Sequence, residues 1–256
     1  MRAVITAGGL VDGAFAEAIG GRVKALAPFG ARTLLDVALD ACIGAGIYGV
    51  AVIGGPETGA RLDARAAGDR AIFAGGVRLI DADSDGRVNV LRALGAWPRE
   101  RFLYLTSDMP FATVAGVRDL IARSEGYALT MALAAVSDYE ARFPGAGEHS
   151  VALGGERVAN GNAFVIAPEA VAPARAFATK LFAARKSLPR LALLLGPVMC
   201  LRFATKRLTI ADLEAFGRRR LGVPVGALRG CDPGLCYDVD TLADYEYALV
   251  HAEARV

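Results

Sequence analysis

Short, almost wholly apolar segments recur along the first half of the chain. They are four to eight residues long and span 3–6, 48–53, 77–80, 102–105 and 127–134. Their apolar character is continuous rather than alternating, which is typical of strands that are buried on both faces. The pattern therefore predicts five buried strands.

Segments with helical periodicity separate these strands. In residues 33–46 the apolar positions form one stripe, Thr33 stands where a capping residue is expected, and two glycines end the segment. Helices are also predicted over 89–96 and 114–123. Strands that alternate with helices predict an α/β fold in three layers, with a mostly parallel central sheet covered on both faces.

Ligands in such sheets bind outside the carboxyl ends of the strands. The candidate site is therefore the set of loops that begin at Ala7, Gly54, Asp81 and Thr106. These four positions are far apart in the sequence, and the predicted sheet brings them to one edge.

The second half of the chain is more helical. Helices are predicted over 168–184, 187–195, 210–220 and 241–254, with Thr209 capping the third, and a strand over 223–228. The longest apolar run, 191–201, contains a glycine and a proline and is shorter than the roughly 20 residues of a membrane span, so we interpret it as core. No linker stands out, so residues 1–256 are predicted to be one domain. Residues 137–203 are predicted to be an addition to this domain on the side where the acceptor binds.

The chain has 256 residues, 54% of them hydrophobic, which is enough for a sizeable core. Its formal net charge of +2 gives no support for a protein that binds nucleic acid by bulk charge. The apolar stretch at the N-terminus is too short for a signal peptide, and the four cysteines do not follow zinc-ligand spacing. These features predict a cytoplasmic protein that has neither a membrane nor a nucleic-acid partner, and they leave the oligomeric state open.

Ala7, Gly8 and Gly9 follow directly on the first predicted strand. Glycine lets backbone amides approach a phosphate closely, although a plain turn explains the same residues. Two common phosphate loops are excluded. Lys24 lacks the glycine before it and the Ser or Thr after it that a P-loop needs, and the second strand ends in GGP (54–56) rather than in the acid of a dinucleotide-binding fold.

Residues 7–9 (AGG), 24–30 (KALAPFG), Leu34 and Leu35 resemble the opening of MobA-like NTP transferases, which have a Rossmann-like fold of the GT-A type. The resemblance implies that the glycines line a triphosphate and that Lys24 neutralises it. The family's usual loop arginine is replaced by a longer, acidic stretch over 10–21, a variant glycine loop in which Arg22 is the candidate substitute. The nucleotide-binding set that we predict is Ala7, Gly8, Gly9, Arg22, Lys24, Gly54, Asn89 and Asp108.

Residues 106–111 (TSDMPF) resemble the family segment whose aspartate binds magnesium, which implies that Asp108 is a metal ligand. A helix cap or turn former is the other interpretation of a single aspartate after a strand. Residues 237–245 resemble the closing segment of the family, and the implied second carboxylate is Asp240 or Asp238. The alternative is that Asp240 or Thr241 caps the last helix.

Three further positions keep two interpretations each. Asn89 is predicted to cap the helix that follows it, either as its only role or while also touching the nucleotide base. Asn162, in GNAF (161–164), is either a structural turn residue or a contact to the acceptor. Arg185 and Lys186 either grip an acceptor phosphate or belong to a solvated surface.

These features predict a Mg²⁺-dependent nucleotidyltransferase with Lys24, Asp108 and Asp240 as its catalytic residues. It would move a nucleoside monophosphate from a nucleoside triphosphate to a phosphorylated small molecule, a cofactor or a sugar phosphate, and release pyrophosphate. A GT-A glycosyltransferase that uses a nucleotide-sugar is one alternative, and a nucleotide-binding protein without catalytic activity is the other.

Overall fold

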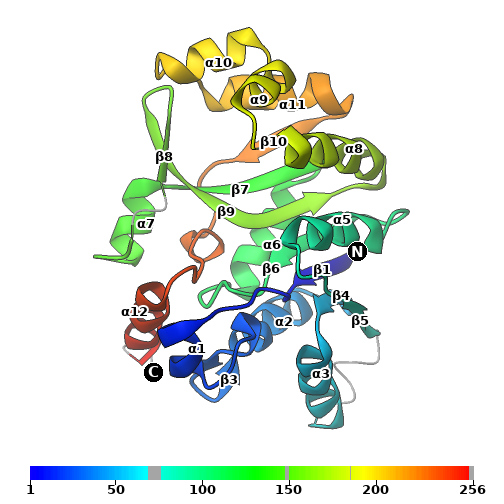
Figure 1. The fold of residues 1–256 in the computed structure, drawn as a ribbon, viewed down its shortest axis with the longest axis vertical. Coiled ribbons are helices and arrows are strands. Elements are labelled where there is room, and N and C mark those ends of the chain that lie inside the picture. The colour runs from blue at the N-terminus through cyan, green and yellow to red at the C-terminus, as the bar shows by residue number, and fades with distance from the viewer. Residues whose placement is uncertain (69–75, 148–149, 185, 254–256) are drawn as a thin grey trace.

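An eight-stranded sheet runs through the middle of the molecule (Figure 1). The computed structural model describes residues 1–68, 76–147, 150–184 and 186–253. The strands of the sheet are β1 (Arg2–Thr6), β4 (Gly49–Gly54), β5 (Val77–Asp81), β6 (Phe102–Thr106), β7 (Leu129–Ala135), β8 (Ser150–Leu153), β9 (Glu156–Ile166) and β10 (Val225–Leu228). A separate hairpin pairs β2 (Pro28–Phe29) with β3 (Arg32–Thr33).

The order of neighbouring strands is β10-β7-β9-β6-β1-β4-β5, and β8 pairs with β9 outside that row. All neighbours in the row are parallel except at β9, which is antiparallel to both β6 and β7. The predicted mostly parallel sheet is thus confirmed. Residues 137–203 contribute β9 to the centre of this sheet, and only the helices of that segment lie outside it.

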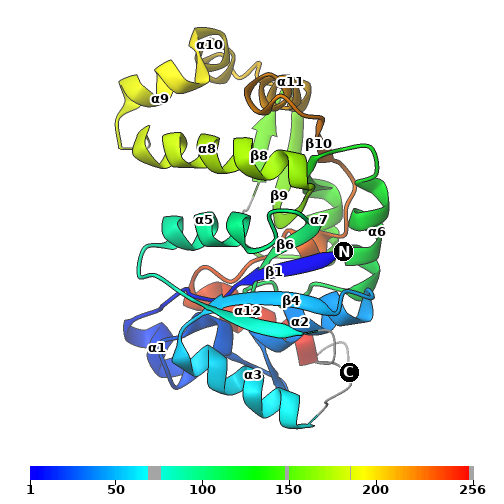
Figure 2. The same ribbon diagram turned by 90° about the vertical axis from the view of Figure 1, so that its right-hand side faces the viewer.

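Helices cover both faces of the sheet. They are α1 (Gly13–Ile19), α2 (Leu34–Gly44), α3 (Pro56–Gly68), α5 (Gly86–Ala96), α6 (Val114–Arg123), α7 (Val136–Arg142), α8 (Pro168–Ala184), α9 (Leu188–Leu195), α10 (Pro197–Ala204), α11 (Ile210–Leu221) and α12 (Leu242–Glu253), with short 3₁₀ turns η1 (Lys24–Leu26) and η2 (Pro233–Leu235). Figure 2 shows α5 and α8 on one side of the strands and α2 and α3 on the other. The alternation of β1 follows this arrangement, since Val4 packs in the cluster of α5 and α8 while Ala3 and Ile5 pack in the cluster of α2 and α6.

The two helix caps predicted from sequence are confirmed. Thr33 and Asp36 form a reciprocal capping box at the start of α2, and Thr209 and Asp212 form another at the start of α11. Prediction failed where the apolar signal was weak or interrupted. Apart from the short β2–β3 hairpin and the two 3₁₀ turns, the elements that it missed are α1, α3, α7, α10, β8 and β9.

The apolar run 191–201 is not core, contrary to our interpretation. It is divided between α9 and α10 by Gly196, whose φ is +89°. Leu193 is 83% exposed and Leu201 65% exposed. Two short helices at the end of the molecule each have only one side against neighbours, so much of their apolar surface meets solvent (Figure 1). Among the described residues, none of the helices combines the length and the hydropathy that crossing a bilayer requires.

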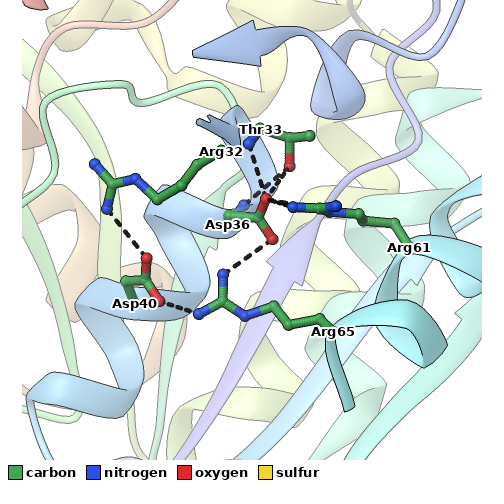
Figure 3. Close-up of polar contacts among 6 residues, drawn as sticks. All are labelled: Arg32, Thr33, Asp36, Asp40, Arg61 and Arg65. Atoms are coloured by element: carbon green, nitrogen blue, oxygen red, sulfur yellow. Dashed lines mark hydrogen bonds and ion pairs between the residues drawn. The ribbon is translucent and has the colours of Figure 1, made fainter. Parts of the chain in front are cut away.

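A buried carboxylate joins α2 to α3 below the sheet (Figure 3). Asp36 is fully buried. Its oxygens accept hydrogen bonds from the Thr33 amide at 2.8 Å and from Arg61 Nε at 3.1 Å, and Arg65 Nη1 lies 3.0 Å from Oδ1. Arg65 also pairs with Asp40. Since a buried charge is tolerated only when it is paired and hydrogen-bonded, this network ties the two helices together.

We expect Asp36→Asn to lower the free energy of unfolding by about 3 kcal/mol, because it leaves two arginines facing a neutral group. Asp40→Asn is the matched control. Asp40 is one-third exposed and pairs with Arg32 and Arg65, so its loss should cost less than about 1 kcal/mol. Urea unfolding of the three proteins at pH 7 measures both values, and equal losses would show that burial of Asp36 has no special weight.

The same carboxylate should make stability depend on pH. Burial opposes ionisation of Asp36, but the hydrogen bonds from Arg61, Thr33 and Arg65 outweigh it and lower the pKa below its ordinary value. The unfolded chain then binds the proton more readily, so this stabilisation is present above about pH 4 and is lost as pH falls further. Between pH 5 and pH 3 the wild type should lose more unfolding free energy than Asp36→Asn loses, and parallel curves would contradict this.

Candidate active site

One ammonium group holds together three distant segments of the chain. Lys24 Nζ lies 2.5 Å from Asp108 Oδ2 and 3.3 Å from Asp240 Oδ1, and it donates a hydrogen bond of 2.8 Å to the carbonyl of Val239. The side chains of Lys24 and Asp108 are 15% and 13% exposed, whereas that of Asp240 is 62% exposed. The predicted catalytic residues therefore converge at one point.

Backbone hydrogen bonds fix each arm of this cluster. Asp108 follows β6, and the Ser107 amide donates to Thr6 O, which extends the pairing of β6 and β1 by one residue. The Val239 amide donates to Asp108 O at 2.9 Å, which attaches the closing segment to the same point. Lys24 begins η1, and its amide donates to Gly9 O at 3.0 Å. Asp108 thus follows a strand end directly, and backbone hydrogen bonds hold the other two arms of the cluster in place.

Burial lowers the pKa of Lys24, but the charges and hydrogen bonds of Asp108 and Asp240 outweigh burial and raise the pKa above its ordinary value. The amine therefore stays protonated throughout the physiological range. A lysine held in this form is suited to neutralising an anion and not to acting as a base.

A pocket of about 390 Å³ opens beside this cluster at the carboxyl ends of β1 and β6. It is lined by the glycine loop, Lys24 and Asp108, together with Asn89 and Val90 of α5. Asp108 Oδ1 and Thr106 Oγ1, which belong to two lining residues, are buried and have no hydrogen-bond partner among the described residues. A buried carboxylate oxygen without a partner is costly unless a ligand or ion satisfies it.

Gly8 allows the glycine loop to lie against Ala82, which directly follows β5. A Cβ at Gly8 would lie 2.8 Å from Ala82 Cβ, closer than real Cβ contacts occur, and 3.0 Å from Asn89 Nδ2, which is a tight contact. A Cβ at Gly9 would make only ordinary contacts, 3.5 Å from the Lys24 side chain. The first glycine is therefore required by packing, and the second leaves the pocket floor open.

The long stretch after the glycines, residues 10–23, forms an excursion that contains helix α1, and its two ends pair with each other. Leu10 pairs with Val23 in an isolated antiparallel bridge, and the Val11 amide donates to Arg22 O at 2.8 Å. Between them α1 packs Phe15 against Tyr245 of α12, at 5.6 Å between ring centroids. Arg22 forms an exposed ion pair of 2.6 Å with Asp12 of the same excursion.

Ala7 and Gly54, like the exposed Arg22, are predicted nucleotide-binding positions that do not line the pocket. The Ala7 amide donates to Ile53 O at 2.7 Å, and its side chain belongs to the core. Gly54 lies against Thr58, whose Cβ would be 2.6 Å from a Cβ at this position. Both residues shape the strand ends from which the pocket is built.

Asn89 does not cap α5, contrary to our prediction. The cap is Asp85, which accepts from the Arg87 amide. Asn89 is buried inside the helix, accepts from the Asp83 amide at 2.7 Å and donates to Asp83 O at 2.9 Å. It fixes the loop at the mouth of the pocket, and it also lines the pocket.

The closing segment contains the helix cap that we considered. Thr241 accepts from the Asp244 amide and donates to its carboxylate, so Thr241, and not Asp240, caps α12. The carboxylate of Asp240 is left to pair with Lys24. Burial alternates before it, since Tyr237 and Val239 are buried and Asp238 is not, which places Asp238 and Asp240 on one side as predicted.

The predicted acceptor residues are dispersed. Asn162 lies in β9 and not in a turn, because Gly161 and its neighbours form a bulge opposite Ala132 of β7. The last pair of β9 with β6 is Ala163 with Leu105, so Asn162 stands opposite Thr106 at the carboxyl edge. Lys186 is exposed in the turn after α8, and Arg185 lies outside the described residues.

Sequence reasoning missed Tyr104 and Thr6, whose hydroxyls lie 3.2 Å apart on the pocket wall. Burial, opposed by the hydrogen bond with Thr6 and aided by the charge of Asp108, raises the pKa of Tyr104. A detectable signal existed: both residues place a polar atom in an otherwise apolar strand, on the same face as Thr106. Within the part of the chain that the structure describes, no three acidic, histidine or cysteine side chains come together as a metal cluster.

Comparison with known proteins places this geometry in context. The family model of the MobA-like NTP transferase domain matches residues 3–206. A hypothetical transferase of Thermus thermophilus is 28% identical with a TM-score of 0.77, over 95% of this chain and 99% of that one. No curated protein matches the chain by sequence.

More distant solved structures share the fold. A 4-diphosphocytidyl-2C-methyl-D-erythritol synthase from Anaerococcus prevotii is 12% identical with a TM-score of 0.59, over 98% of this chain and 97% of that one. A 2-C-methyl-D-erythritol 4-phosphate cytidylyltransferase, also from Thermus thermophilus, is 17% identical with a TM-score of 0.53, over 98% of each chain.

The two glycines of the loop should respond differently to the same substitution. Gly8→Ala forces its new Cβ against Ala82 and Asn89, so it should lower the free energy of unfolding by about 1–3 kcal/mol. Gly9→Ala meets no such contact and should change it by less than about 1 kcal/mol. Thermal and urea unfolding of both variants test this, and a Gly8→Ala protein as stable as Gly9→Ala would contradict the close packing.

Proposed function

The chain belongs to the MobA-like NTP transferase family, and from this we propose that it transfers a nucleoside monophosphate from a nucleoside triphosphate to a phosphorylated small-molecule acceptor. The observation that supports the proposal is the convergence of Lys24, Asp108 and Asp240 beside a pocket floored by glycines. This arrangement suits a polyphosphate, because it offers a fixed cation, open backbone and carboxylates at one strand edge.

In the proposed reaction a phosphate oxygen of the acceptor attacks the α-phosphorus of the triphosphate. The bond from the α-phosphorus to the bridging oxygen breaks, and pyrophosphate leaves with that electron pair. An ionised phosphate needs no base to activate it, so the protonated Lys24 is no obstacle. Catalysis then consists of positioning and charge neutralisation, in which Lys24 stabilises the charge that develops on the phosphates.

The residues present also fit a Mg²⁺ ion. Asp108 Oδ1 is a buried hard donor without a partner among the described residues, and Asp240 shares the same ammonium group. We assign these two carboxylates as metal ligands, with Asp238 beside them on the same side. When bound, Mg²⁺ supplies positive charge to the phosphate oxygens. Lys24, which neutralises both carboxylates here, would itself contribute positive charge to the triphosphate.

The remaining site residues take supporting roles in this proposal. Gly8 and Gly9 bring the backbone close to the phosphates, and Asn89 holds the pocket mouth near the base. Arg22 reaches the triphosphate only after leaving Asp12, an exposed ion pair that costs little to break. Asn162, at the carboxyl edge beside Thr106, is placed to contact the acceptor, whereas nothing in the described structure links Lys186 to the site.

Removal of the proposed metal ligand is the direct test. Asp108→Asn should reduce magnesium-dependent pyrophosphate release by more than about a hundredfold, and a loss under about tenfold, or roughly 1.4 kcal/mol of barrier, would argue against a ligand role. Asp119→Asn is the matched control, because Asp119 is an exposed aspartate that pairs with Arg123 on α6, and it should retain full activity.

A nucleotide screen separates the three functions considered from sequence. Melting temperature is measured with nucleoside triphosphates and nucleotide-sugars, with and without Mg²⁺. We expect stabilisation by triphosphates that requires Mg²⁺ and is absent in Asp108→Asn. A preference for nucleotide-sugars would favour a glycosyltransferase, and stabilisation that is independent of metal would favour a binding protein without catalysis.

A further inference from the structure

A second pocket, almost entirely apolar, lies on the same side of the sheet as the active site. It measures about 430 Å³ and lies between β7, β8, β9 and β10 below and α10 and α11 above (Figure 1). Among the side chains that line it are Met131, Leu133, Leu153, Val158, Ile210 and Leu213. Of the described residues in its lining, only Asn160 and Glu214 are polar, and one oxygen of Glu214 accepts from the Ala227 amide. Such a lining suits an apolar ligand, not a sugar.

The register of the sheet places this pocket next to the active site. Tyr104 of β6 pairs with Phe164 of β9, which pairs in turn with Met131 of β7. Tyr104 lines the active-site pocket, and the other two residues line the apolar pocket. The rings of Tyr104 and Phe164 are in edge contact, with centroids 5.7 Å apart. Along the sheet the two pockets are thus separated by one pair of side chains on neighbouring strands, which α8 covers from above.

The polar end of the apolar pocket points to the same sheet edge as Asp108. Along β9, Asn160 and Asn162 lie beyond Phe164 in the direction of the carboxyl end of β6. Asn160 lines the pocket, and Asn162 stands opposite Thr106. A ligand with an apolar body and one polar end would therefore place its polar end towards the reaction centre.

The outer rim of the pocket is exposed and apolar. Phe203 of α10 lines the pocket and is 69% exposed, and Val151 of β8 is 41% exposed. Positive charge is also concentrated in the segment that carries α10 and α11: residues 186–229 contain nine Lys and Arg against two Asp and Glu, a net charge of +7 in a protein of +2. An anionic molecule is attracted to such a surface.

We propose that the acceptor is a phosphorylated amphiphile, whose apolar part occupies this pocket while its phosphate extends past Asn160 and Asn162 to Lys24. This inference rests on the proposed function and names the class of acceptor for it. The apolar part provides binding energy away from the reacting atoms and fixes the phosphate for attack.

Binding without turnover tests the pocket separately from the chemistry. n-Alkyl phosphates of two to ten carbons, kept below their micelle-forming concentrations, are titrated calorimetrically into the wild-type protein. Each added methylene that becomes buried should tighten binding about fourfold until the pocket is filled. Glycerol 3-phosphate serves as the hydrophilic reference. An affinity that does not change with chain length would overturn the proposal.

Two exposed apolar residues give a matched pair of variants. Phe203→Asp places a charge at the pocket rim and should weaken octyl phosphate binding at least about tenfold. Leu193→Asp, on α9 and 83% exposed, does not line the pocket and should bind as the wild type does. Ala227→Phe fills the pocket from β10 and should also remove the dependence on chain length. Melting temperatures verify that all three variants are folded.

The outcomes distinguish this inference from the proposed function. Alkyl phosphates that bind with the expected dependence, but release no pyrophosphate with any nucleotide, support the pocket and reject nucleotidyl transfer. Pyrophosphate release with hydrophilic phosphates alone, with no binding of alkyl phosphates, supports the transfer and rejects the amphiphile. If Phe203→Asp converts an oligomer into a monomer, the pocket is covered by a second copy of the chain and the proposal fails.

Discussion

The ion pair between Lys24 and Asp108 is the constraint on which the organisation of this molecule depends. It joins the end of the glycine excursion to the carboxyl end of β6, and Asp240 brings the segment before α12 to the same point. Two carboxylates that close together would repel without a cation between them. The buried ammonium group therefore keeps the site assembled, and it also sets the condition for function, because a ligand must replace its interactions before Lys24 can turn to a phosphate.

Strand β9 divides the sheet into two parts with different chemistry. On one side of it, β6, β1, β4 and β5 form a parallel set whose carboxyl ends carry the glycines and Asp108. On the other side, β7 and β10 present apolar side chains beneath α11. Because β9 runs antiparallel, its bulge at 161–163 lies at the carboxyl edge of its neighbours, between the two parts. One reversed strand thus connects the polar and the apolar pocket.

Much of this architecture was predictable from local signals. Continuous apolar runs identified β1, β4, β5, β6 and β7, and the Thr33 and Thr209 caps marked two helices, because each signal has a local physical cause. Strand ends that meet at one edge predicted the place of the glycines and of Asp108, whereas Lys24 and Asp240 were assigned to the site only through the family resemblance. Local patterns do not determine which strands lie next to each other or which surfaces are covered by other elements. Neither the position of β9 between β6 and β7 nor the exposure of 191–201 can be derived from them, since both depend on which surfaces the other elements leave uncovered. The cap interpretation of Asn89 and the turn interpretation of Asn162 failed for the same reason. Asn89 bonds to Asp83, and Gly161 beside Asn162 packs against Ala132, contacts that only the folded chain creates.

The two ends of the stretch that contains α1 are joined by backbone pairing, so the positions of Gly9 and Lys24 do not depend on the length of this stretch. Leu10 and Val23 meet across the bridge, and the amide of Lys24 is bonded to Gly9, so the two ends of the insertion are held together whatever lies between them. Exposed residues of the excursion can therefore be exchanged without moving the glycines or the lysine, whereas Phe15 is buried against Tyr245 and keeps α1 in place. Sequence variation in this segment is thus tolerated at its solvent-facing positions, while the geometry at its base is preserved.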